Sequence, residues 1–101
     1  MAEVILSPEA RDDLLSIVAH LVAVAGLPTA DKWDRKLWAA IDGLQDFPGS
    51  GAPRAALGAH TRIVAVRPYI VIYEHVRASK LVHVLCVFHG RRNITQALLK
   101  T

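Results

Sequence analysis

A chain of 101 residues has room for one domain and excludes a second, so we expect residues 1–101 to fold as a single unit. The apolar residues make up 52% of the chain, a high share that predicts a surface for contact with a partner. No apolar run is long enough to span a bilayer, and the lone Cys86 excludes an intrachain disulfide. The net charge of +3 is divided unevenly along the chain: residues 1–50 hold eight acids and four bases, whereas residues 51–101 hold one acid and eight bases. The basic second half favours an acidic protein or nucleic-acid target over a merely solvated basic face.

The first half of the chain predicts a short strand followed by two helices. Glu3–Leu6 is the strand candidate, and Ser7 has the character of an N-cap, because a proline follows it and apolar residues then recur at helical spacing as far as Gly26. We expect Thr29 to cap a second helix, which ends at Phe47–Pro48. The link between the helices is short, which predicts an antiparallel helical hairpin.

The second half predicts a sheet. Residues 50–60 resemble a loop, and after them come three segments rich in β-branched and aromatic residues, Arg62–Arg67, Tyr69–Val76 and Leu81–His89. Their short links predict an antiparallel meander. Asn93 is placed to cap a short final helix, Ile94–Lys100. The predicted fold is therefore α+β with the order β-α-α-β-β-β, in which the helical hairpin packs on one face of a mostly antiparallel four-stranded sheet.

The alternation along the last two strands predicts which residues face the helices. The expected core face carries Ile70, Ile72, Val82, Val84, Cys86 and Phe88. The opposite face then carries an aromatic and histidine-rich set, Tyr69, Tyr73, His75, His83 and His89. An aromatic and histidine-rich face is unusual for a surface that contacts only solvent, so this pattern predicts contact with a partner.

Two segments of the second half resemble the ParE toxins. The run from Thr61 to Glu74 is similar to the central hairpin of that family, and the run from Val84 to Asn93 is similar to its last strand, which often ends in His-Gly-Arg-Arg. The Ser7-Pro-Glu-Ala opening and the Phe47-Pro48 helix end are also similar to the family. The resemblance covers nearly the whole chain, and its ordered set of motifs is more specific than any one of them.

The resemblance implies the toxin of a type II toxin–antitoxin system, a group of modules that includes plasmid-stabilisation systems. Such a toxin inhibits DNA gyrase and stops replication. The resemblance also implies that the toxin forms a hetero-oligomer with a ParD-like ribbon-helix-helix antitoxin. The toxin would then contact operator DNA only indirectly, through the antitoxin. The sequence shows neither a signal peptide nor a membrane segment, so we expect a cytoplasmic protein.

The related RelE branch shares this fold but cuts mRNA on the ribosome. Its lysine, arginine and tyrosine positions align with Ile63, Ala65, Ile70, Arg91 and about Ala97, and only the arginine could transfer a proton or stabilise charge. A second ribonuclease pattern, similar to YoeB, retains only His89. The five histidines show no metal-binding spacing. We therefore expect no catalysis, metal or cofactor, and keep two alternatives, a RelE-like endoribonuclease and a non-toxic antitoxin-binding member.

Candidate binding residues follow from these patterns and from the resemblance. The predicted target-binding set is Arg62, Arg67, Tyr69, Tyr73, His89, Arg91 and Arg92, each of which also has a structural interpretation such as cross-strand packing or closing a strand end. Trp38 lies off the apolar stripe of the second helix. Together with Leu21, Leu37 and Ile41 it is predicted to bind an amphipathic antitoxin segment in a groove between the helices and the sheet.

Overall fold

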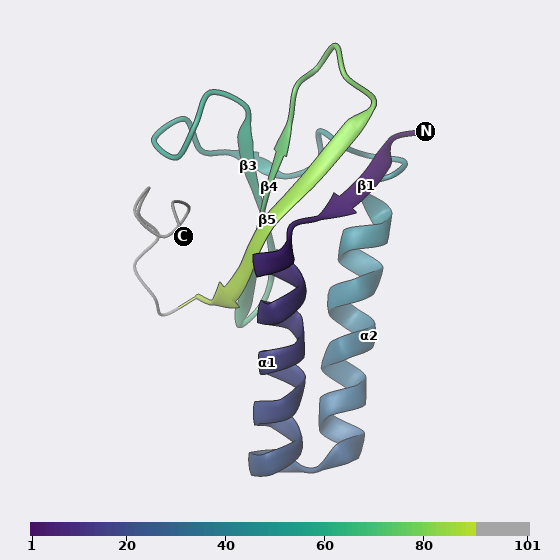
Figure 1. Ribbon diagram of the computed structural model, residues 1–101, viewed down its shortest axis with the longest axis vertical. Helices are drawn as coiled ribbons and strands as arrows, with labels where there is room; N and C mark the ends of the chain where they lie inside the picture. Colours follow the sequence, from purple (N-terminus) through teal and green to yellow (C-terminus); the bar gives the residue numbers. More distant parts are fainter. Residues whose placement is uncertain (91–101) are drawn as a thin grey trace.

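The computed structural model describes residues 1–90, and Figure 1 shows a helical hairpin beside a twisted sheet. The elements in chain order are β1 (Glu3–Leu6), α1 (Pro8–Ala25), α2 (Leu27–Gly43), β2 (Ala52–Pro53), β3 (Thr61–Val66), β4 (Tyr69–His75) and β5 (Leu81–His89). The predicted α+β arrangement is confirmed, with one addition. The two-residue β2, expected as loop, forms a fifth strand at the sheet edge, where a proline is tolerated because its missing N–H faces no neighbour. Arg91, Arg92 and the predicted helix Ile94–Lys100 lie outside the described residues.

The strand order in the sheet is β1-β5-β4-β3-β2. β1 pairs with β5 in parallel, and the remaining neighbours are antiparallel, as the short links of the meander require. Both helices lie on one side of the sheet, and their hairpin continues well past the sheet end at which β5 finishes (Figure 1). The far part of the hairpin therefore has no sheet to cover it.

The helix ends show which sequence signals were decisive. Ser7 is the N-cap of α1, as predicted, and its hydroxyl oxygen accepts a hydrogen bond from the Ala10 N–H at 3.0 Å. The prediction that Thr29 caps α2 is wrong, because α2 already begins at Leu27. Gly26, with φ of +89°, ends α1 and starts α2, and Pro28 then stands in the first turn, where a missing N–H carries no penalty. α2 also ends earlier than predicted, at Gly43 rather than near Phe47.

The predicted faces of β4 are reversed in the structure. Tyr69, Val71 and Tyr73 pack against the helices and are at most 7% exposed, whereas Ile70 and Ile72 belong to a second apolar cluster. That second cluster also contains Leu57, which comes from the loop between β2 and β3. Both faces of β4 are therefore covered, and alternation alone could not show which one meets the helices.

The faces of β5 change partway along the strand. Val82 and Val84 face the helices as predicted, but a register shift opposite Ile72/Tyr73 then places Val87 on that side. Cys86 and Phe88 consequently pack in the second cluster, beside Leu57, so their predicted placement is wrong. His89 pairs with Tyr69, which places both residues on the helix side and not on the outer face that the sequence predicted.

The main core lies between the helices and the sheet. The helical side of this core consists of Ala10 and Leu14 from α1, Leu37 and Ile41 from α2, and Leu44 directly after α2. Leu37 and Ile41 are 0% and 1% exposed, so the predicted antitoxin groove between helices and sheet is already filled by the chain's own side chains. Direct antitoxin contact by these two residues is incompatible with that burial, and their role is to hold α2 on the sheet.

Candidate functional site

A cleft of about 430 Å³ lies at the end of the β3–β4 hairpin, where the last strand also finishes. Its lining consists of Ala65, Arg67, Pro68, Tyr69, Ile70, His89 and Gly90. The Gly90 N–H donates a hydrogen bond to the Pro68 carbonyl oxygen at 2.7 Å, which fixes the end of β5 against the hairpin turn. A Cβ at position 90 would lie 3.0 Å from the same oxygen, so the approach is close enough to favour glycine.

The rings of Trp33, Tyr69 and His89 lie in a row in space and form the helix-side wall beside this cleft. The Trp33 and Tyr69 ring centroids are 5.6 Å apart and those of Tyr69 and His89 are 5.8 Å apart, both in edge-to-face geometry. The Lys36 ammonium lies 4.8 Å from the Trp33 ring centroid, on the α2 end of the row. Burial raises the pKa of the Tyr69 phenol, which therefore stays neutral. Tyr69 is a fixed wall of the site and not a free anchor.

The structure brings together some of the predicted target-binding residues and separates others. Arg67 and His89 line the same cleft, and within residues 1–90 they are its basic side chains. Tyr73 is 0% exposed, which overturns its predicted place on the outer face. Arg62 lies at the opposite end of β3 from Arg67, about 17 Å away along the strand at roughly 3.3 Å per residue. Arg91 and Arg92, which follow Gly90, are outside the described residues.

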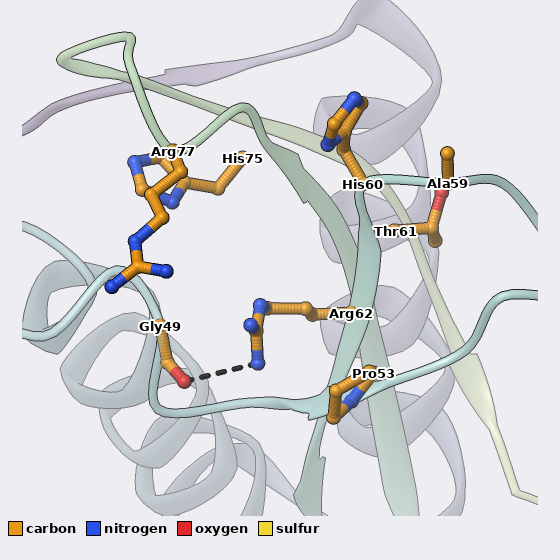
Figure 2. Close-up of a pocket in the computed structure, with 8 residues that line it drawn as sticks. All are labelled: Gly49, Pro53, Ala59, His60, Thr61, Arg62, His75 and Arg77. Carbon is orange, nitrogen blue, oxygen red and sulfur yellow. Dashed lines mark hydrogen bonds between the residues drawn. The ribbon is translucent and has the colours of Figure 1, made fainter.

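Arg62 and Tyr73 together hold the loop that follows α2, a role that the sequence did not reveal. The Arg62 guanidinium donates from Nη1 to the carbonyl oxygens of Gly51 at 2.7 Å and of Gly49 at 3.1 Å, the second of which Figure 2 shows. The Tyr73 hydroxyl accepts from the Gly51 N–H at 2.9 Å and donates to the Pro48 carbonyl at 2.8 Å. In the sequence, Gly49 and Gly51 indicated only that a turn lies between α2 and β3, and they did not show which side chains hold it.

The positions that align with ribonuclease groups form an apolar patch. Ala65 pairs with Ile70 across the β3–β4 ladder and Ile63 pairs with Ile72, so these side chains share the face opposite the helices. Ile63 and Ile70 pack against the cluster that contains Leu57. None of the three aligned side chains can accept or donate a proton.

The helical hairpin offers a separate apolar surface on its outward side. Leu15, Ala19 and Val22 are exposed and recur at i, i+4 and i+7, so they form one stripe along α1, which we call the α1 stripe. Trp38 on α2 is 38% exposed, as its position off the predicted stripe suggested, and Leu21 is half-buried against the core. The α1 stripe was missed because a long apolar run hides which of its residues face outward.

Two further properties of residues 1–90 concern membranes and metal ions. Neither helix there has the length and apolarity that crossing a membrane requires. The same residues contain no cluster of three or more His, Cys, Asp or Glu side chains that could hold a metal ion.

Comparison with known proteins places the chain. The family model described as "ParE toxin of type II toxin-antitoxin system, parDE" matches residues 4–94. No curated protein matches the sequence. A solved structure described as "Chromosomal ParDE TA system from P. aeruginosa" superposes with a TM-score of 0.74 at 22% identity, covering 88% of this chain and 96% of that chain, which shows that the two share a fold. Because the family model spans nearly the whole sequence, this chain belongs to the ParE toxin family of type II toxin–antitoxin systems.

Proposed function

We propose that the protein inhibits DNA gyrase by binding, without catalysis of its own, and that a ParD-like antitoxin neutralises it. The observation that carries this proposal is the match to the ParE toxin family over residues 4–94. The apolar side chains at Ile63, Ala65 and Ile70 support a non-catalytic mechanism, because RNA cleavage needs a base, an acid and a cation beside the phosphate.

The proposed target contact is the cleft at the β3–β4 turn. Arg67 and His89 line it, and Arg91 and Arg92 follow within two residues of Gly90 in the sequence. Arg67 and His89 at this end of the sheet, with two further arginines next in the sequence, would suit an acidic surface on gyrase or on the DNA that gyrase holds. Tyr69 contributes the rigid wall behind His89.

The proposed antitoxin contact is the outward side of the helical hairpin. The α1 stripe and Trp38 expose apolar surface that an amphipathic helix could cover, and Leu21 contributes from the boundary of the core. The resulting complex would be a hetero-oligomer in the cytoplasm, and it would reach operator DNA only through the antitoxin. Plasmid stabilisation is one role that such a pair would support.

The proposed function can be tested by inducing the chain in bacteria without its antitoxin. We expect filamentation, an SOS response and cleaved chromosomal DNA. The double variant Arg67→Gln with His89→Gln should weaken this effect, whereas Arg11→Gln, which removes one exposed charge on α1, should not. Growth that is unaffected by the wild-type chain would contradict toxicity and favour a member that only binds antitoxin.

One observation favours a second candidate, a ribosome-dependent endoribonuclease. Arg67 and His89 share one cleft, and they could supply a cation and an imidazole for proton transfer. Immediate arrest of translation, with mRNA cut in the ribosomal A site and no SOS response, would establish that reading and refute gyrase inhibition.

A further inference from the structure

A second cleft, of about 690 Å³, opens at the other end of β3, away from the proposed target contact. Figure 2 shows the side chains that line it, of which Arg62 comes from β3, His75 from the end of β4 and Arg77 from the turn that follows. The other lining residues are Gly49, Pro53, Ala59, His60 and Thr61. None of the lining residues within residues 1–90 is acidic, and besides Thr61 the polar side chains there are two guanidinium groups and two imidazoles.

Within residues 1–90, no ion pair joins an arginine of this cleft to an acidic side chain. The one ion pair recorded within residues 1–90 joins Arg35 to Asp31 on α2. Glu74 is the sole acid of residues 51–101, and it precedes His75 in β4, so alternation directs it to the opposite face of the sheet from that histidine. Like charges gathered without a counter-charge repel one another, and a bound anion would remove that repulsion.

Arg62 is held in place in a way that leaves binding capacity free. Its Nη1 group uses two N–H donors on the carbonyl oxygens of Gly49 and Gly51, and a guanidinium carries five donors in a rigid planar fork. The Nε and Nη2 groups keep the remaining three. In Figure 2 the Arg62 and Arg77 side chains reach toward the same space from opposite sides. A fork fixed beforehand loses little side-chain entropy on binding an oxyanion.

The histidine beside Arg77 is also oriented by the backbone. Nε2 of His75 lies 3.1 Å from the Ser79 carbonyl oxygen, which can only accept. Nε2 therefore carries the proton, and Nδ1 is the atom that remains for a ligand. The bond also ties His75 to the β4–β5 turn, so that the ring and Arg77 are positioned by the same short segment.

We propose that this cleft binds the phosphate group of a small ligand, such as a mononucleotide. The planar forks of Arg62 and Arg77 match the spacing of phosphate oxygens, and Nδ1 of His75, which accepts when Nε2 carries the proton, is available to a hydroxyl group of the ligand. The volume lies within the range of sites for small ligands, and the loop at Gly49 and the β2 edge close one side of it. The proposed phosphate site does not depend on gyrase inhibition, and each of the two proposals is tested by its own experiment.

The test is a titration of the ¹⁵N-labelled full chain followed by NMR, with inorganic phosphate, a mononucleotide and a short single-stranded DNA as probes. We expect saturable shifts at the Arg62 and Arg77 side-chain N–H groups and at the His75 ring, with a Kd for phosphate on the order of 1 mM. Arg77→Gln should weaken phosphate and mononucleotide binding roughly tenfold, or about 1.4 kcal/mol. Arg77 is exposed, so its loss should leave the fold intact.

Arg11→Gln is the matched control, because it removes the same charge from an exposed site on α1. It should leave phosphate affinity within about twofold, because Arg11 does not line the cleft and exposed charges interact weakly through water. The proposal is overturned if phosphate and the mononucleotide cause no saturable shift, or if Arg11→Gln weakens binding as much as Arg77→Gln. Binding of the DNA alone, unaltered by Arg77→Gln, would equally overturn it.

Discussion

The carboxylate Oδ2 of Asp13 on α1 accepts a hydrogen bond from the backbone N–H of Val87 on β5 at 2.9 Å. This contact lies beside the register shift at which Ile72 pairs with Cys86 but Tyr73 pairs with Val84, which leaves Leu85 without a partner on β4. The Ser7 hydroxyl donates to the Leu85 carbonyl oxygen at 2.8 Å. Two polar side chains near the start of α1 thus satisfy backbone groups that the irregular ladder leaves open, and they fasten the helix to the sheet.

Replacing Asp13 should therefore destabilise the fold. Asp13→Ala leaves the Val87 N–H partly buried without this acceptor, which costs about 1–3 kcal/mol in the free energy of unfolding. Asp12→Ala removes a neighbouring exposed carboxylate and should change stability by less than about 0.5 kcal/mol. Urea denaturation of both variants measures the difference. Equal effects would show that the Asp13–Val87 hydrogen bond is not important for stability.

A second prediction concerns the loop held by Tyr73. Tyr73→Phe removes the acceptor of the buried Gly51 N–H and the donor to the Pro48 carbonyl, so we expect a loss of about 1–3 kcal/mol. The comparison is Tyr69→Phe, because no hydrogen bond of the Tyr69 hydroxyl is recorded within residues 1–90, and this change should cost less than about 0.5 kcal/mol near neutral pH. Thermal unfolding of the two variants gives the comparison. A Tyr73→Phe protein as stable as wild type would refute the proposed role of the hydroxyl.

The strong local signals of the sequence were enough for most of the architecture. A strand at Glu3–Leu6, a strand at Leu81–His89 and the Ser7 cap all stand where the sequence predicted them, because each depends on propensity and capping chemistry close in the chain. The predicted start of the second helix was wrong, because α2 begins at Leu27 and not after Thr29. Gly26 is both the C-cap of α1 and the N-cap of α2, so the signal that ends one helix and the signal that starts the next fall on the same residue.

The candidate sites were harder to predict, because they depend on which face of each strand is covered. Leu57 packs on the face of β4 opposite the helices, so both faces of that strand are apolar, and the alternation could not decide that Tyr73 belongs inside. The unpaired Leu85 then reverses the alternation of β5. These effects come from a distant loop and a register shift, neither of which has a local sequence signature.

Burial of Tyr69 gives a prediction for alkaline pH. Because the folded chain raises the pKa of this phenol above its ordinary value of 10.0, the native state holds the proton more firmly than the unfolded state does. The associated stability is fully present below about pH 10 and is lost as the pH rises through the raised pKa. Urea denaturation between about pH 8 and pH 11 should show a steeper loss for wild type than for Tyr69→Phe. Parallel pH profiles would contradict the burial argument.

The two tryptophans of α2 should separate antitoxin binding from stability. Trp38→Ala should weaken binding of a ParD-like antitoxin by about 2 kcal/mol, roughly 30-fold in Kd, and should lower stability less than Trp33→Ala does, because Trp38 is 38% exposed. Trp33→Ala should instead lower stability, since Trp33 packs on the Tyr69 ring. Calorimetric titration and thermal unfolding measure the two effects. Unchanged antitoxin affinity in Trp38→Ala would remove that residue from the interface.

The most direct test of a non-catalytic gyrase inhibitor combines purified chain, gyrase and supercoiled plasmid in one reaction. We expect linear, cleaved plasmid to accumulate with protein concentration, and addition of the antitoxin to suppress it. The Arg67→Gln with His89→Gln variant should require a higher concentration for the same cleavage. Intact plasmid at saturating protein, together with cleavage of ribosome-bound mRNA by the same sample, would contradict the proposed function.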